Sequence, residues 1–213
     1  MPAADSATQW CKNMASRDKL PNPPAGTPGL AGLAAVERER GLPPVHLWHP
    51  PFCGDIGMKI ACDGTWFYRG SPIGRAALVK LFASILRKDA DRYVLVTPVE
   101  MVSVEVEDAP FLAVEMQDFE RGGARVLRFR TNVDDWVEVD ADHPLRFDRG
   151  AHDGIKPYVK VRGDLWALVA RAVGYDLIER AETRVVGAQA CLGVASGGQF
   201  FVIAPAAAIE GLA

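Results

Sequence analysis

An internal repeat constrains the fold of this chain more than any other feature of its sequence. The segment ACDGTWFY at residues 61–68 aligns with AHDGIKPY at 151–158, an offset of ninety, and Ala, Asp, Gly and Tyr match in place. At the same offset residues 77–79 and 167–169 both read Ala-Leu-Val. Three single matches continue the alignment: Val96 with Val186, Val104 with Val194, and Phe111 with Phe201. The order of these matches predicts a tandem duplication of one supersecondary unit.

The first copy of the unit is expected to contain a β-hairpin followed by a helix. Alternating apolar residues predict a strand over 58–62, and Asp63-Gly64 is a typical two-residue hairpin turn. Apolar residues at helical spacing predict a helix over 72–88, with Ser71 as its N-cap. Other strands are expected at residues 93–97, 101–107, 111–116, 125–131 and 136–139.

The second copy repeats this order. A strand is expected over 157–161, and a helix over 164–173 ends before Gly174, a residue suited to a C-terminal cap. Three more strands are expected at 184–187, 191–194 and 199–203. The predicted fold class is therefore α+β, with a duplicated hairpin-helix-strands unit and antiparallel sheets.

Three segments follow from this pattern. Residues 1–47 are expected to be a flexible N-terminal segment with a short helix over 30–40, and the proline-rich stretch 45–55 is expected to lack regular structure. The repeat assigns 48–120 to a first domain and 121–213 to a second. In an alternative division, the strands from 93 to 161 and the following helix form a barrel capped by a helix, with the boundary near residue 90.

Composition excludes several classes of function. The chain has 213 residues and a formal net charge of −3, so it lacks the basic character expected of a nucleic-acid-binding protein. No apolar run reaches the length that crosses a bilayer, and the first twenty residues do not resemble a secretory signal. We therefore expect a cytoplasmic protein with no membrane partner, and free thiols at its four cysteines.

Several longer strings resemble the bacterial domain-of-unknown-function 1285 family. They are WHPPFCGDIGMKIACDGTWFYRGSPIGRAALVKLF at 48–82, LVTPVE at 95–100, VEDAPF at 106–111, FRTNVDDWV at 129–137 and PYVKVRGDLWALVARAVGYDL at 157–177. The resemblance covers about residues 30–204 and implies a duplicated α+β core whose later part is similar to a pleckstrin-homology barrel. It also implies a role in signalling or ligand binding. Gly57 departs from the family's usual acidic residue.

Motifs for catalysis and metal binding are weak. His46, His49 and Cys53, with Cys62 nearby, offer zinc-ligand chemistry, but no second compact ligand pair accompanies them. Ser196 lies in Ser-Gly-Gly without a nucleophile elbow, and no phosphate-binding glycine loop is present. We therefore expect no metal, no cofactor and no assignable catalytic residue.

The candidate ligand-binding residues are polar side chains of the recognised motifs that neither a core nor a cap explains. Arg128 and Arg130 share strand parity, so their guanidinium groups are expected to project from one face and could hold a phosphate or carboxylate. An exposed strand edge protected by charge is the alternative interpretation. The predicted site comprises Arg75, Arg130, Asn132, Tyr158 and Arg162, and we expect these residues to line a groove between the two repeats.

Three functional hypotheses remain. The favoured one is a non-enzymatic binding module that recognises a small anionic molecule or a protein partner, and the family resemblance links such a module to signal transduction. The second is an enzyme of unknown reaction in the same groove, which a cluster of perturbed acidic, histidine or cysteine side chains would favour. The third is a structural or assembly subunit, which a large apolar surface patch would favour.

Overall fold

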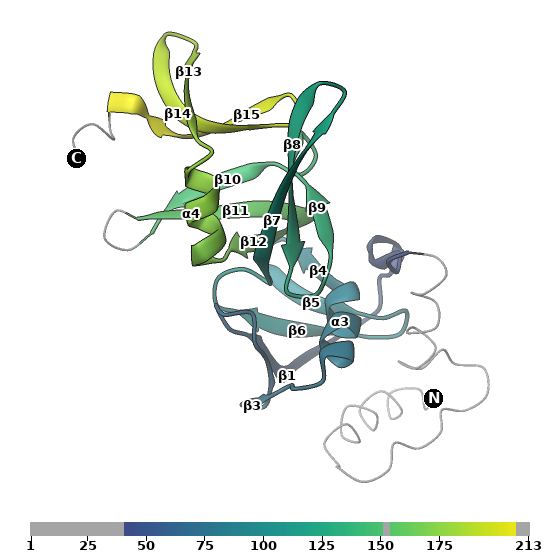
Figure 1. The fold of residues 1–213 in the computed structure, drawn as a ribbon. Coiled ribbons are helices and arrows are strands. Elements are labelled where there is room, and N and C mark those ends of the chain that lie inside the picture. Colours follow the sequence, from purple (N-terminus) through teal and green to yellow (C-terminus); the bar gives the residue numbers. More distant parts are fainter. Residues whose placement is uncertain (1–40, 151–153, 208–213) are drawn as a thin grey trace, which may run out of the picture. The chain divides into compact units, whose positions relative to one another are not determined.

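The computed structural model describes residues 41–150 and 154–207 (Figure 1). Contact density divides this part of the chain into two units. The first contains the chain up to Lys59 together with Trp66–Glu105, and the second contains Ile60–Thr65 and the chain from Val106 onward. The helix expected over 30–40 lies outside the described residues.

The first unit is a six-stranded sheet with one α-helix, preceded by the short 3-10 helix η1 (Val45–Leu47). The spatial order of the strands is β3-β2-β1-β6-β5-β4. Their bounds are β1 Phe52–Ile60, β2 Trp66–Tyr68, β3 Ser71–Pro72, β4 Leu86–Asp89, β5 Arg92–Val96 and β6 Met101–Val106. Helix α3 spans Ala76–Ser84, and its Phe82 ring stacks on buried Trp66 with centroids 6.1 Å apart.

The second unit has two sheets and one helix. Its larger sheet has the order β10-β11-β12-β7-β8-β9, and its smaller sheet has the order β13-β14-β15. The bounds are β7 Phe111–Arg121, β8 Ala124–Thr131, β9 Trp136–Glu138, β10 Leu145–Arg149, β11 Ile155–Arg162, β12 Leu165–Val169, α4 Arg171–Ile178, β13 Glu182–Val186, β14 Gln189–Ser196 and β15 Gln199–Pro205. Residue 120, the boundary predicted from the repeat, falls in β7.

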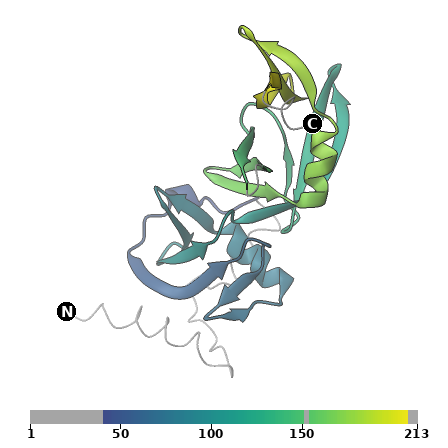
Figure 2. The same cartoon turned by 90° about the vertical axis from the view of Figure 1, so that its left-hand side faces the viewer.

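The larger sheet curls into half a barrel (Figures 1 and 2). All of its neighbouring strands are antiparallel except β12 and β7, which run parallel with Ala167 opposite Phe111. Buried Phe111, Phe129 and Val159 contribute to the core, to which α4 adds Val173 and Leu177. The described chain is therefore mostly β with two α-helices, an α+β arrangement of two repeat-like units.

A buried serine ties the two sheets of the second unit together. The Ser196 hydroxyl donates a hydrogen bond to the Val139 carbonyl (2.7 Å) and accepts one from the Leu127 amide (2.8 Å). Ser196 is 1% exposed, so without its hydroxyl both contacts would be lost in a site that water does not reach. This serine has a structural role at the junction between β14 and β8.

The first helix is shorter than the sequence pattern predicts. Ser71 does not cap it, because Ser71-Pro72 forms β3 and pairs with Tyr68 and Phe67. The turn between β2 and β3 is Arg69-Gly70, and both residues have positive φ (49° and 77°), as a type I′ turn requires. The helix therefore begins only after Arg75, its N-cap, and the chain enters β4 at Leu86.

The prediction of a helix over 164–173 is wrong for the first half of that range. Residues 165–169 form β12, in which Leu165, Ala167 and Val169 are buried and the residues between them are half-buried. This period-two burial is that of a strand. Helix α4 follows at Arg171–Ile178, so Gly174 lies inside it rather than beyond its end. At the offset of ninety, the helix of the first unit therefore aligns with the end of β12 and the first half of α4.

Three other local predictions are corrected. The stretch 45–55 is not irregular, because it contains η1 and the start of β1. The Asp63-Gly64 segment does connect β1 to β2, but the connection has five residues rather than two. Strands β4 and β10 are additional to the predicted strands, and both are short and carry few apolar side chains.

Candidate functional site

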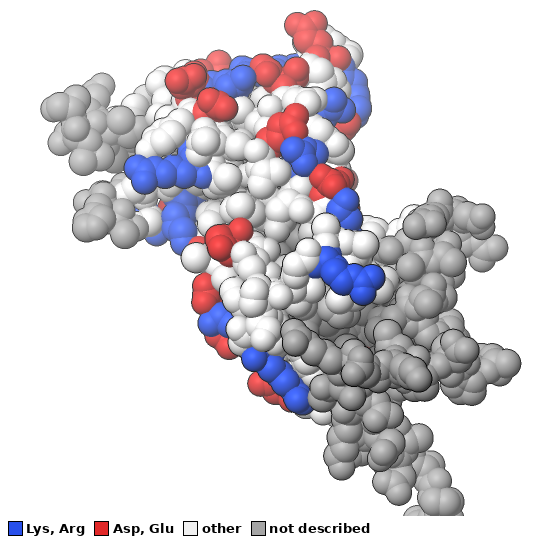
Figure 3. Space-filling model, turned by 60° about the horizontal axis from the view of Figure 1, so that its bottom comes forward, with Lys and Arg blue, Asp and Glu red and all other residues white. Residues whose placement is uncertain are grey.

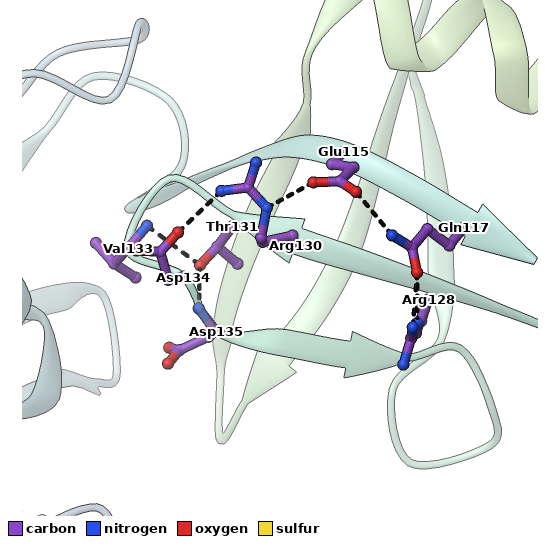
Figure 4. Close-up of polar contacts among 8 residues, drawn as sticks. All are labelled: Glu115, Gln117, Arg128, Arg130, Thr131, Val133, Asp134 and Asp135. Atoms are coloured by element: carbon purple, nitrogen blue, oxygen red, sulfur yellow. Dashed lines mark hydrogen bonds and ion pairs between the residues drawn. The ribbon is translucent and has the colours of Figure 1, made fainter. Parts of the chain in front are cut away.

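Three of the predicted site residues meet at the turn between β8 and β9. Thr131 organises this turn, because its buried hydroxyl accepts hydrogen bonds from the amides of Val133 (3.3 Å) and Asp135 (3.1 Å) (Figure 4). Asp134 takes a positive φ of 67° within the turn. The Thr131 hydroxyl thus takes the place of a backbone carbonyl as hydrogen-bond acceptor for these two amides. It thereby fixes the backbone that carries two adjacent carboxylates, Asp134 and Asp135.

Each of these carboxylates binds one predicted arginine. Arg130 Nη1 lies 2.8 Å from Asp134 Oδ1 and its Nε lies 2.7 Å from Glu115 Oε2 (Figure 4). Arg162 Nη1 lies 2.7 Å from Asp135 Oδ2, and its guanidinium lies over the Phe111 ring at 5.0 Å. The hydrogen bond to Glu115 is the largest cause that raises the pKa of Arg130, followed by that to Asp134. Both arginines are therefore neutralised by carboxylates of the protein itself.

Asn132 also has a structural role. Its Oδ1 accepts a hydrogen bond from the Leu112 amide (3.1 Å), and its Nδ2 donates to the Gly64 carbonyl (3.3 Å). Its own backbone amide donates to the Leu112 carbonyl at 2.8 Å. The side chain thus joins β7 to the 60–65 segment, and these two side-chain bonds leave it one amide proton and one lone pair for a ligand.

Tyr158 belongs to a different cluster, formed around a largely buried carboxylate. Its hydroxyl donates to Asp108 Oδ1 at 2.6 Å, and Lys156 pairs with Asp108 Oδ2. Burial alone raises the pKa of Asp108, but the hydrogen bonds from Lys156 and Tyr158 outweigh it and lower that pKa. Burial also raises the pKa of Tyr158, and the bond to Asp108 raises the pKa of Lys156. All three groups are held in their ordinary charge states at neutral pH.

Arg75 lies in the first unit, as the exposed N-cap residue of α3. Its carbonyl accepts hydrogen bonds from the amides of Leu78 and Val79, so its backbone begins the helix. The expectation that Arg75 and the four residues of the second unit line one groove stays a prediction. For the four residues of the second unit, the structure shows contacts within the protein that explain their polar side chains.

Arg128 shares the strand of Arg130 but is not among the five predicted site residues. Its Nε and Nη2 both donate to Gln117 Oε1, at 3.1 and 2.6 Å (Figure 4). Its guanidinium lies 4.7 Å from the Trp136 ring centroid and 5.5 Å from that of Phe119. In the described part of the chain no carboxylate lies within ion-pair distance of it. Strand parity with Arg130 is the signal in the sequence that points to it.

The neighbours of Arg128 explain why it lacks a carboxylate. Glu138 is opposite Arg128 in the β8–β9 register, but both of its oxygens bind Arg121, at 2.6 and 2.8 Å. Glu115 binds Arg130 and also Gln117. We call Gln117, Phe119, Arg128 and Trp136 the Arg128 surface. Its arginine forms no ion pair in the described chain. The Arg128 charge acts on Glu115 only from beyond ion-pair distance, as a lesser cause of that carboxylate's lowered pKa after the hydrogen bonds from Arg130 and Gln117.

A second arginine has similar aromatic neighbours. Arg146 on β10 lies 4.7 Å from the ring centroids of both Tyr158 and Trp166. Unlike Arg128, it forms an ion pair, because its Nη2 lies 3.1 Å from Asp148 Oδ2. Ion pairs between nearby side chains recur elsewhere in the described chain. Basic and acidic side chains are also interspersed on the face drawn in Figure 3.

Two absences apply to residues 41–150 and 154–207. No group of three His, Cys, Asp or Glu side chains there is arranged to hold a metal ion. No helix in the same ranges combines the length and the apolar character that a bilayer-spanning segment needs.

The fold and contacts define a two-unit α+β protein whose motif residues are largely occupied by internal pairing. Residues 43–109 match the N-terminal domain of DUF1285, a domain of unknown function, and residues 110–203 match the C-terminal domain of the same family. The chain therefore belongs to the DUF1285 family, as its sequence motifs predict.

Two solved structures are similar. A crystal structure of a DUF1285 family protein from Silicibacter pomeroyi DSS-3 has 43% sequence identity and a TM-score of 0.75, with 85% of this chain and 98% of that chain covered. A DUF1285 family protein from Shewanella baltica OS155 has 31% identity and a TM-score of 0.48, with 58% and 91% covered. A comparison with curated proteins finds no match.

Proposed function

We propose that this protein is a non-enzymatic binding module that recognises an anionic group through the Arg128 surface. The carrying observation is the Arg128 guanidinium, which two rings and Gln117 hold in place without a carboxylate partner in the described chain. Gln117 takes up only Nε and one Nη2 proton, and a guanidinium has five donor protons. Donors on Nη1 therefore remain to bind a carboxylate or phosphate.

The surroundings of Arg128 are typical of a binding site. Trp136 is 43% exposed beside it, and Trp and Arg are the residues that most often dominate binding energy at interfaces. The contacts with Gln117 and the two rings restrict the guanidinium, so little side-chain entropy is lost when a ligand binds. The anionic group can belong to a small molecule or to an acidic side chain of a protein partner.

The Asp108 cluster gives no support to the alternative of an enzyme. A general acid or base works best when its pKa lies near the working pH. The pKa of Asp108 is lowered, while those of Lys156 and Tyr158 are raised, so each moves away from neutrality. An ion pair that stabilises the fold accounts for these directions.

The half-barrel and α4 support a further proposal, that the second unit is a pleckstrin-homology-like domain. The Arg128 surface lies on β7, β8 and β9, so its side chains are carried by paired strands rather than by a long loop. A fold alone does not define a function, so the proposal of anion binding depends on the Arg128 surface rather than on the half-barrel. A role in signal transduction follows if the anionic group belongs to a regulated metabolite or partner.

The test is a thermal-shift screen of the whole chain against inorganic phosphate, nucleotides, citrate and an oligo-glutamate peptide. A ligand at one hundred times its Kd stabilises the fold by about 2.7 kcal/mol, which is readily measured. Arg128→Gln should weaken a bound anion about tenfold or more, because a hydrogen bond to a charged group is lost. Arg128→Lys keeps the charge but not the planar donors, so its affinity should fall between those of the native chain and Arg128→Gln.

Arg146→Gln is the matched control, because Arg146 also contacts two rings but is paired with Asp148. It should leave binding unchanged. Anions that bind Arg128→Gln as well as the native chain would contradict the proposal. If no probe binds, the Arg128→Gln chain serves as the comparison bait in affinity capture. Partners retained equally by both baits would contradict the proposal too.

A further inference from the structure

Among the described residues, strand β13 is an edge strand of the smaller sheet in the second unit, with no strand paired on its outer side (Figure 1). It pairs with β14 over five consecutive residues with no register shift, from Glu182 opposite Gly193 to Val186 opposite Gln189. All five of its side chains are exposed, and Val185 is 74% exposed. Proteins usually protect such an edge with charged side chains, proline, a bulge or inward-pointing charge, and of these β13 carries the charged residues Glu182 and Arg184. Strand β13 has neither a proline nor a bulge.

The register shows which backbone groups of β13 face outward. Val186 and Gln189 flank the two-residue turn Gly187-Ala188, and the residues that flank such a turn form a hydrogen-bonded pair. Hydrogen-bonded and non-hydrogen-bonded pairs alternate along an antiparallel ladder. The amides and carbonyls of Val186, Arg184 and Glu182 therefore point to β14, and those of Thr183 and Val185 point away from the sheet.

We propose that β13 pairs with β13 of a second copy of this chain, antiparallel and about a twofold axis at Thr183. In this register the outward groups of Thr183 bond to Thr183 of the second copy, and the Val185 amide donates to the Ala181 carbonyl of the second copy. The Ala181 amide keeps its bond to the Ile178 carbonyl of its own chain. Glu182 then lies opposite Arg184 of the second copy, and Arg184 opposite Glu182. The two smaller sheets become one continuous six-stranded sheet.

Charge complementarity selects this partner and this register. The Glu182 and Arg184 side chains are half exposed, at 47% and 50%, and already attract each other within one chain at 2.6 Å. The Phe200 ring supports the Arg184 guanidinium at 5.0 Å. In the dimer the two residues occupy non-hydrogen-bonded pairs, in which side chains on neighbouring strands come closest. Each twofold contact supplies two such pairs.

Other registers fit less well. An axis at Arg184 also uses outward backbone groups, with Thr183 opposite Val185, but it places two arginines opposite each other. An axis at Val185 uses outward groups but places Arg184 opposite Val186, so it forms no ion pair. The Thr183 axis combines outward backbone groups with opposite charges.

The experiment is sedimentation equilibrium of the whole chain, which measures the dimer Kd. Glu182→Arg and Arg184→Glu should each weaken the dimer about tenfold, because each variant replaces two attractive cross-strand pairs with like charges. The double variant should recover the native Kd, because its charges are exchanged but still complementary. Circular dichroism checks that every variant folds.

A backbone substitution gives an independent test. Thr183→Pro removes an outward amide but no bond to β14, so the monomer should fold and the dimer should be lost. Thr183→Ala keeps the amide and should remain dimeric. A native chain that sediments only as a monomer would overturn the proposal. A dimer that tolerates both Thr183→Pro and the single charge reversals would overturn it as well.

Discussion

Asp108 shows how burial and pairing decide the role of a single residue. Its side chain is only 16% exposed, and burial opposes its charge, yet Lys156 and Tyr158 donate to both of its oxygens. In the sequence Tyr158 is a polar residue without a local explanation, which makes it a candidate ligand-binding residue. The Asp108 contact is long-range, fifty residues away along the chain, so no local pattern indicates it.

We predict that Asp108→Asn destabilises the fold by about 2 kcal/mol at neutral pH, because two charge-assisted hydrogen bonds are weakened. The folded-state pKa of Asp108 lies below its ordinary value of 3.8, so the carboxylate stabilises the fold above that pH. This contribution is lost as the pH falls through the lower folded-state pKa. Urea unfolding across the acidic range measures the difference between the two proteins.

Asp118→Asn is the control for this prediction. Asp118 pairs with Arg125 and Arg180 but its side chain is 39% exposed, so solvent screens both pairs. Its removal should change the free energy of unfolding by less than about 1 kcal/mol. Equal effects of the two substitutions would contradict the role assigned to burial at Asp108.

At the scale of elements, the turn between β8 and β9 packs against the 60–65 segment and is hydrogen-bonded to it. Gly64 has a φ of 81°, and a Cβ placed there would lie 2.6 Å from Asn132 Nδ2. The sequence identifies Asp63-Gly64 as a turn from residue type alone. Only the fold shows that Asn132 uses this turn as a hydrogen-bond partner.

We predict that Gly64→Ala destabilises the protein by about 2–3 kcal/mol, because it adds a close contact with Asn132 to the strain of a positive φ. Gly123→Ala is the matched control, since Gly123 has a φ of 77° and a Cβ added there would meet no atom of the described chain within 4 Å. It should cost about 1 kcal/mol from the backbone strain alone. Thermal unfolding of both variants gives the comparison, and equal losses would argue against the Asn132 contact.

At the scale of the whole molecule, the second unit includes the segment Ile60–Thr65, which lies in the sequence between two parts of the first unit. The Glu107 amide donates to the Ile60 carbonyl at 3.0 Å, and the Cys62 amide donates to Glu107 Oε2 at 3.0 Å. The match to the C-terminal family domain begins at residue 110, after these contacts. A linear boundary thus omits residues that the second unit uses.

We predict that a fragment starting at Val106 loses hydrogen-exchange protection at Glu107, because its carbonyl partner at Ile60 is absent. The Leu127 amide, bonded to Ser196 within the same fragment, should keep its protection and serves as the internal reference. Hydrogen exchange of the fragment and of the whole chain makes the comparison. Unchanged protection at Glu107 would contradict the assignment of 60–65 to the second unit.

The sequence by itself determined the fold class, the family and most strands, because alternation, turn residues and contiguous motifs are local signals. It missed the strand nature of 165–169, since apolar residues there fit both a helix and a buried strand until β11 and β7 are in place.

Only the tertiary structure decided which candidate site residues have partners within the protein. Arg130, Asn132, Tyr158 and Arg162 are partnered by residues that folding brings to them. Arg128 has no carboxylate partner in the described chain, because Arg121 occupies Glu138. Polar residue types can be read from a sequence, but which charges neutralise each other depends on distances that only the fold sets.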